Sequence, residues 1–327
     1  MKRSLNIILF FDIVLKNSSE YVIIKIYEFK GGVNLELTKY HYCIWLTKIF
    51  GIANPKIHKV IEKYGSPENA YNEITRGDRS VLSNDETKQL NKFSMGSIDK
   101  IISHCEKKNI SLCALGDSNY PKLLKEIYDP PVIFYYRGDL SCLDALSLTF
   151  VGARDVTPYI RRLCSRISYD IARMGITLVS GMAHGVDACV HTACVGGEGK
   201  TVAVLACGID EDYPTGSLKL RREIVELGGV CMTELPPGTG ASSEYFNPRN
   251  RIMAGLTRGT AVFQASMTSG ALVTASYALD ENRDVFCVPP PDLLSSSYSG
   301  VVGFLRDGAV PIFNHDDILN EYRGLYI

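Results

Sequence analysis

Short apolar runs alternate with amphipathic segments throughout the second half of the chain. The apolar runs recur at regular intervals, at 148–151, 176–179, 201–206, 230–233, 261–265 and 284–288. Near-continuous apolar strands separated by helices are typical of a parallel sheet covered on both faces. We therefore expect residues 114–327 to form an α/β domain with a doubly wound, mostly parallel, Rossmann-like sheet.

The segment 157–175 shows how clearly the helices between these strands are marked. Thr157 is placed to cap a helix, Pro158 suits its first turn, and Gly175 is placed to end it. The apolar positions between them share one helical face, at Ile160, Leu163, Ile167 and Ile171. This stripe predicts a helix that packs against the sheet.

The chain before residue 114 follows a different pattern. Residues 39–113 read as short, polar-faced helices, and we expect a small helical domain similar to SAM or helix–hairpin–helix modules. The turn at Gly51 lacks the usual second glycine of such a hairpin, so a plain helical bundle is favoured. Residues 1–38 are an N-terminal extension without an assigned role, in which 21–29 predicts a strand with no evident partner.

Residues 112–140 resemble a linker that leads into the α/β domain. Pro121 suits the first turn of a short helix, which the prolines at 130 and 131 are expected to end. A strand is predicted directly after them, at 132–136.

The apolar run at the N-terminus is interrupted by Asp12, and it is too short to cross a bilayer. We therefore expect no membrane association.

Charge and cysteine usage narrow the possible functions. The 35 Lys and Arg residues face 36 Asp and Glu residues, for a net charge of −1, so a nucleic acid could bind only through a local patch. The 10 cysteines include no Cys-x-x-Cys pair, and several, such as Cys207 and Cys287, lie in apolar runs. This usage is typical of reduced, buried thiols in the cytoplasm, and it predicts neither disulfides nor a metal site.

Small residues recur where the predicted strands end. Ligands of doubly wound sheets bind at that edge, where glycine lets backbone amides approach and helix N-termini favour anions. We therefore expect a phosphate-type ligand there. The pocket-lining candidates are Gly152, Ser180, Gly181, Ser269, Gly270 and Thr274, with Arg154 beside them.

Residues 244–259 carry the clearest sign of nucleic-acid binding. Two aromatic side chains precede two arginines and an asparagine at the start of an apolar helix: Tyr245, Phe246, Arg249, Asn250 and Arg251. Arginine forks bind phosphates, and aromatic faces stack on bases of any sequence. The alternative is a charge cluster that only caps and solvates the helix, but its compactness and aromatic neighbours favour binding.

Three further patterns indicate no cofactor and no enzyme chemistry. The glycine-rich run 196–201 precedes a strand, whereas a P-loop follows one, and no Gly-x-Gly-x-x-Gly follows any strand. Asp187 and His191 stand four residues apart on a predicted helix and could form a metal or acid–base pair. No third ligand or nucleophile has a suggestive spacing, so a hydrogen-bonded structural pair is favoured.

Taken in order, these motifs resemble the DNA-processing protein A (DprA, also called Smf) family. The resemblance covers about residues 40–320, and the matching motifs are 152–154, 180–187, 204–214, Glu234, 246–251, 269–275, 283–286 and 307–309. The chain departs from the usual family residues at Ala153, His184 and Pro290, where serine, arginine and glycine are common.

The resemblance implies a homodimer that binds and protects incoming single-stranded DNA in natural transformation and loads the RecA recombinase onto it, with no established catalytic reaction. It also implies that the arginines and asparagine hold phosphates, namely Arg154, Arg249, Asn250 and Arg251, while the small residues shape the pocket. Position and chemistry make Tyr245 or Phe246 the base-stacking candidate. The alternatives are a nucleotide-processing hydrolase or a nucleotide sensor, although 266–275 carries no acid to serve a hydrolase.

Overall fold

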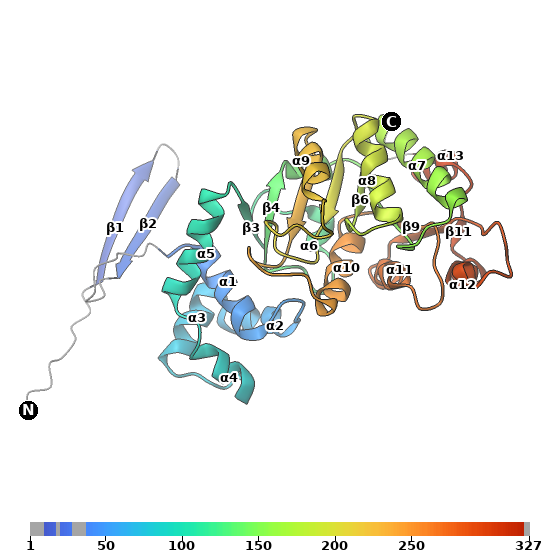
Figure 1. Cartoon of the computed structure of the whole chain (residues 1–327). Coiled ribbons are helices and arrows are strands. Elements are labelled where there is room, and N and C mark those ends of the chain that lie inside the picture. Colours follow the sequence, from blue (N-terminus) through green and yellow to red (C-terminus); the bar gives the residue numbers. More distant parts are fainter. Residues whose placement is uncertain (1–9, 18–19, 28–36, 324–327) are drawn as a thin grey trace, which may run out of the picture.

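The computed structural model describes residues 10–17, 20–27 and 37–323. A cluster of helices precedes a larger α/β part (Figure 1). This cluster consists of α1 (Lys39–Phe50), α2 (Lys56–Tyr64), α3 (Pro67–Arg76), α4 (Asn84–Leu90) and α5 (Met95–Lys107). Helix α1 lies at its centre, with Trp45 buried, and α3, α4 and α5 pack around it. Gly51 and Gly65 end α1 and α2, as helix-breaking residues are expected to do.

The N-terminal segment contains a two-stranded antiparallel sheet. Strand β1 (Phe10–Asn17) pairs with β2 (Glu20–Tyr27), and Phe10 lies opposite Tyr27. The strand expected at 21–29 is present, but the expectation that it has no partner was wrong. Consecutive strands pair more often than not, so the apolar run just before it was the natural candidate.

A sheet of nine strands, within the described residues, carries the α/β part, in the order β11-β10-β9-β5-β6-β7-β8-β4-β3. Its strands are β3 (Ser111–Ala114), β4 (Ile133–Gly138), β5 (Ser147–Val151), β6 (Thr177–Ser180), β7 (Thr201–Val204), β8 (Val230–Thr233), β9 (Gly259–Val262), β10 (Asp284–Cys287) and β11 (Val310–Pro311). The six strands expected from apolar runs, β5 to β10, pair in parallel with one another. The predicted doubly wound, mostly parallel fold is confirmed.

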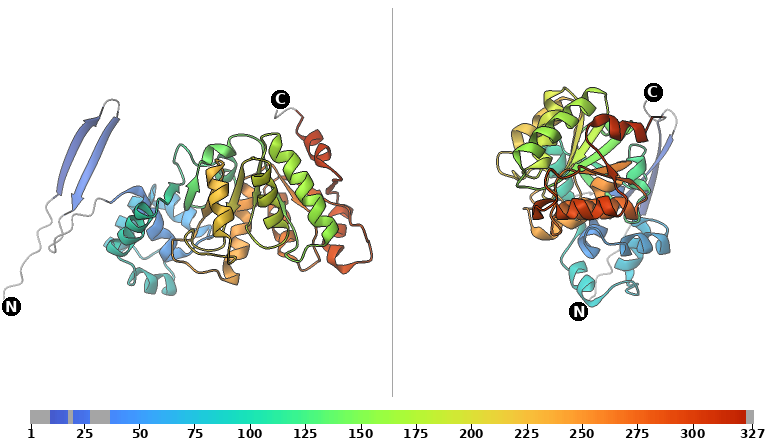
Figure 2. Two further views of the ribbon diagram at one scale, coloured as in Figure 1. Left: turned by 45° about the horizontal axis from the view of Figure 1, so that its top comes forward. Right: turned by 90° about the vertical axis from the view of Figure 1, so that its right-hand side faces the viewer.

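Helices cover both faces of this sheet (Figure 2). They are α6 (Lys122–Lys125), α7 (Pro158–Arg173), α8 (Val186–Gly196), α9 (Leu218–Glu226), α10 (Phe246–Gly255), α11 (Gly270–Asp280), α12 (Ser299–Arg306) and α13 (His315–Glu321). Alternate residues of a strand point to opposite faces. Phe150 of β5 therefore joins the core under α7, α8 and α13, whereas Val151 joins the core under α10, α11 and α12.

The segment 112–140 is part of the sheet and not a linker. Strand β3 pairs antiparallel with β4, and β4 pairs antiparallel with β8. Phe134 and Tyr135 are buried on either side of β4, one in the core of the α/β part and one in the core shared with α1. Helix α6 ends at Lys125, ahead of the two prolines. The short strand β3 and its polar surroundings hid this extension of the sheet.

Gly138 allows β4 to approach β8 closely. Its φ of +109° favours glycine, and a Cβ there would lie 2.0 Å from the carbonyl oxygen of Gly229. We expect Gly138→Ala to lower the free energy of unfolding by about 3 kcal/mol, because neither backbone can give way. Gly303→Ala is the control, since a Cβ there meets nothing and helix α12 favours alanine by about 0.5–1 kcal/mol. Urea unfolding of the parent and both variants measures these free energies. A Gly138→Ala variant as stable as the parent would contradict the expected clash with Gly229.

The expected hydrogen bond between Asp187 and His191 is not formed, because the two side chains bond to different partners. His191 Nδ1 lies 2.9 Å from Thr201 Oγ1, which joins α8 to β7, while an Asp187 oxygen accepts from the amide of Ala183. Complete burial, helped by the nearby charge of Arg249, lowers the pKa of His191 from 6.5 to about 3. His191 is therefore neutral in the folded protein under ordinary conditions.

This burial makes stability depend on pH. Below pH 6.5 the unfolded chain binds a proton at His191 that the folded chain binds only near pH 3, so stability is lost as the pH falls between these values. At pH 5 the loss amounts to about 2 kcal/mol. We expect His191→Gln to be less stable at pH 7.5 but to lose about 2 kcal/mol less than the parent on going to pH 5. Equal losses in both proteins, measured by urea unfolding, would refute this.

Candidate functional site

A pocket of about 260 Å³ lies at the carboxyl ends of the central strands. The loops after β5 and β6 and the first turns of α10 and α11 form its walls. Most of the residues expected at this site line it: Gly152, Arg154, Phe246, Arg249, Asn250, Ser269, Gly270 and Thr274. The structure therefore brings together segments that are more than 100 residues apart in the chain.

The N-terminus of α11 provides one wall of the pocket. Ser269 is the N-cap of α11, and its Oγ accepts from the amide of Ala271 at 3.3 Å. Thr274, one turn further, is buried, and its Oγ1 has no hydrogen-bond partner among the described groups. A helix N-terminus with free hydroxyl capacity favours an anion such as a phosphate.

Arg154 and Phe246 form the mouth of the pocket. The guanidinium carbon of the exposed Arg154 lies 4.9 Å from the ring centroid of Phe246. The Phe246 ring also meets that of Tyr213, with centroids 6.1 Å apart and a tilt of 58°. A guanidinium stacked in this way keeps its N–H edges available to phosphate oxygens. In the sequence Tyr213 is only part of a motif, because its contact joins the segment after β7 to the start of α10.

Arg249 lines the pocket but is buried and does not reach the outer surface. Only 7% of it is exposed, and its Nη1 donates to the carbonyl oxygens of Gly181 and Val204, each at 2.6 Å. A Cβ on Gly181 would lie 2.0 Å from that nitrogen, so glycine is needed there to admit the guanidinium. Ser180 is also buried, and its hydroxyl donates to Phe150 O. Gly181 and Ser180 thus shape the pocket from below without lining it.

Asp187 is a pocket residue that the sequence did not place there. It is buried beside Arg249, and burial raises the pKa of its carboxyl, while the charge of Arg249 opposes this effect. Burial in turn lowers the pKa of Arg249, against the opposing charge of Asp187. An acid therefore does lie next to the glycine-lined turns. The sequence placed Asp187 on a helix, but it did not show that Arg249 packs beside that carboxylate.

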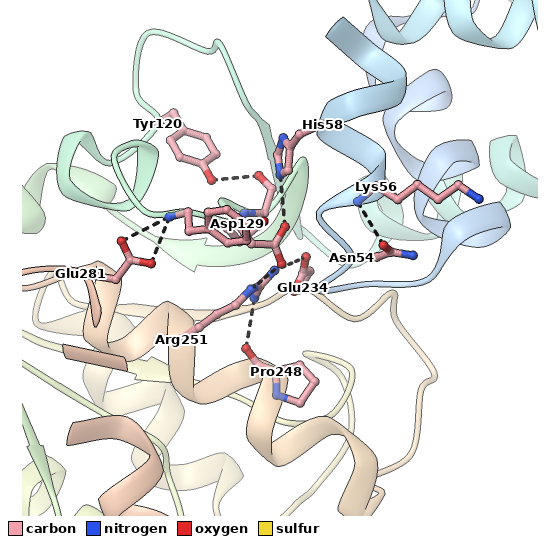
Figure 3. A network of polar contacts seen from close by, with 11 residues as sticks. Asn54, Lys56, His58, Tyr120, Asp129, Glu234, Pro248, Arg251 and Glu281 are labelled. Carbon is pink, nitrogen blue, oxygen red and sulfur yellow. Dashed lines mark hydrogen bonds and ion pairs between the residues drawn. The ribbon is translucent and has the colours of Figure 1, made fainter. Parts of the chain in front are cut away.

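Arg251 is not among the residues that line the pocket, and its guanidinium meets Asp129 instead (Figure 3). It is 5% exposed, and its Nε and Nη2 donate to carboxylate oxygens of Asp129 and Glu234 at 3.1 and 2.9 Å. Its Nη1 donates to Pro248 O at 3.0 Å. All three guanidinium nitrogens have protein acceptors, so the phosphate role expected for Arg251 finds no support. A helix turns by about 100° per residue, which sends Arg249 and Arg251 to different sides of α10.

The remaining predicted residues are Asn250 and Tyr245. Asn250 lines the pocket, accepts from Arg249 Nε at 3.1 Å and donates to Gly270 O at 3.3 Å, so it ties α10 to α11. Tyr245 is partly exposed and lies outside the pocket lining, in a short 3₁₀ turn before α10. Of the two stacking candidates, Phe246 is the one at the pocket.

Among the described residues, no cluster of three or more His, Cys, Asp or Glu side chains could hold a metal ion. No helix in that part of the chain is long and apolar enough to cross a membrane. All ten cysteines are unpaired and buried. The polar and aromatic part of the pocket lining consists of arginine, aromatic, hydroxyl and amide groups and one buried carboxylate.

Comparison with known proteins agrees with the motifs. The family model of DNA recombination-mediator protein A matches residues 111–323. DNA processing protein DprA of Streptococcus pneumoniae is 31% identical over 283 residues, which are 86% of this chain and 98% of that protein. The Bacillus subtilis DprA is 32% identical over 225 residues, which are 68% of this chain and 75% of that protein.

Solved structures give the same answer. The X-ray structure of S. pneumoniae DprA matches with a TM-score of 0.73 and 28% identity, covering 88% of this chain and 99% of that one. The Helicobacter pylori DprA structure, described for its single-stranded DNA binding mode, matches with a TM-score of 0.60 and 28% identity over 67% and 97% of the two chains. The resemblance inferred from the motifs is confirmed, and the chain belongs to the DNA recombination-mediator protein A family, the DprA or Smf proteins.

Proposed function

We propose that this protein binds single-stranded DNA at the pocket between α10 and α11. The observation that carries the proposal is the Arg154 guanidinium stacked on Phe246, in the same pocket as the N-terminus of α11. A phosphate would bind between Arg154 and the first turn of α11, and a base would stack on Phe246. The single-stranded DNA binding described for the H. pylori relative supports this class of ligand.

We further propose that the protein acts as a cytoplasmic homodimer in natural transformation. It would protect incoming single strands and hand them to the RecA recombinase, without a catalytic reaction of its own. The family's description as a recombination mediator supports the handover, and ten unpaired, buried cysteines suit the reducing cytoplasm. The pocket carries one acid, Asp187, but His191 is bonded to Thr201 and supplies no base beside it.

Replacing Arg154 by alanine is expected to weaken binding to single strands of every sequence alike, because the contact is with phosphates. The dependence of log affinity on log salt should become shallower by about 0.7 for each phosphate that the variant no longer neutralises. Arg173→Ala, which removes the same charge at the opposite edge of the sheet, is the control and should bind like the parent. Fluorescence anisotropy with a labelled oligonucleotide measures both quantities.

A flat salt response in the parent would contradict the phosphate contacts. Displacement of the oligonucleotide by equal concentrations of free mononucleotide would also count against the proposal. Either result would favour a nucleotide sensor or hydrolase, since the pocket volume of about 260 Å³ could hold part of a nucleotide.

Replacing Phe246 by alanine should cost about 1–3 kcal/mol of binding free energy and leave the salt slope nearly unchanged, because stacking releases no counterions. Tyr245→Ala is the matched control, since Tyr245 is the neighbouring aromatic residue but does not line the pocket. Its affinity should stay close to that of the parent. The reverse order of the two effects would transfer the stacking role to Tyr245.

A further inference from the structure

A chain of ionic contacts joins the N-terminal helices to helix α10 (Figure 3). His58 of α2 lies with its Nε2 3.2 Å from Asp129 Oδ1, and the other oxygen of Asp129 accepts from Arg251 Nε at 3.1 Å. Glu234, the residue after β8, accepts from Nη2 of the same guanidinium at 2.9 Å. Arg251 therefore contacts Asp129 and Glu234 directly and is linked to α2 through Asp129.

Asp129 is the centre of this chain of contacts. Burial, the largest single influence, raises the pKa of its carboxyl, but the neighbouring His58 ring and the charge of Arg251 together bring the pKa below its usual value. The carboxylate is therefore held ionised by both partners. It lies between α6 and β4, where the neighbouring amide of Tyr128 is bonded to Glu281, the residue after α11. His58 is a polar contact between this loop and the helical cluster.

Arg251 transmits the position of Asp129 to the pocket. Its Nη1 donates to the carbonyl oxygen of Pro248 in the first turn of α10. Phe246 and Asn250, which line the pocket, belong to the same helix. A shift of the Arg251 guanidinium therefore moves the start of α10, and with it the ring expected to stack on a base.

We propose that His58 is a positioning residue through which the N-terminal helical cluster sets the affinity of the pocket for single-stranded DNA. The proposal rests on the proposed function of the pocket. His58 touches no pocket residue, so its effect passes through Asp129 and Arg251. Removing His58 leaves Asp129 paired with Arg251 but takes away its contact with α2, so the loop is held less firmly against the helical cluster.

The chain offers a matched control for this proposal. His104 of α5 makes a second His–Asp contact between the helical cluster and the α/β part, at 3.1 Å to Asp210, in the segment after β7. That contact does not reach Arg251 or Asp129. His58→Ala and His104→Ala therefore each remove one His–Asp contact between the two parts, but only His58 contacts a residue, Asp129, that is itself paired with a side chain of α10.

The test measures affinity for a short labelled oligonucleotide and amide hydrogen exchange of residues 246–251. His58→Ala should bind about five-fold more weakly, the lower end of typical coupling between sites, and α10 should exchange faster. His58→Gln, which can still donate to Asp129, should restore both properties. His104→Ala should match the parent in both.

Two other results would overturn the proposal, and a third would refute the proposed function on which it rests. Parent-like affinity in His58→Ala would overturn the proposal, and so would equal losses in the two alanine variants, which would indicate general docking of the helical cluster. A parent that does not bind single strands would instead refute the proposed function. In that case the exchange of residues 246–251 still decides whether His58 positions α10.

Discussion

Parallel pairing of β5 with β6 on one side and with β9 on the other is the constraint on which the site depends. Parallel strands end at the same edge, so the segments that follow these strands must meet there. The crowding at that edge explains the small residues. A Cβ on Gly152 would lie 2.5 Å from Val186 Cγ2, and one on Gly181 would collide with Arg249. Glycine is thus required there by packing, whatever the ligand is.

The two arginines of α10 show how burial separates roles within one motif. Arg249 is surrounded by backbone carbonyl oxygens and Asp187, whereas Arg251 lies between Asp129 and Glu234. A buried charge is tolerated only when it is paired and hydrogen-bonded, and removing one partner typically costs about 3–5 kcal/mol. Both arginines therefore hold α10 in place. The exposed Arg154 is left as the arginine best placed to meet a phosphate.

Local patterns were sufficient for most of the fold. Helix α7 begins after Thr157 and buries Ile160, Ile167 and Ile171, because caps and apolar spacing act over only a few residues. The apolar runs marked β5 to β10 for the same reason, since strands buried on both faces need continuous apolar sequence. The edge strand β3 was missed because it is short. Strand β4 was expected at 132–136, but its antiparallel place between β3 and β8 was not, because that pairing joins distant parts of the chain.

The order of the motifs determined the family, and the residues after each strand identified the pocket, because both are properties of neighbouring positions. Tertiary structure decided which of those residues face the pocket. Asp129, the partner of Arg251, is 122 residues away from it, and Gly181, which receives Arg249, is 68 residues away. Whether an arginine is exposed or buried depends on such distant acceptors, and no local pattern contains them. Only the folded chain could therefore show that Arg154 is exposed whereas Arg249 and Arg251 are buried.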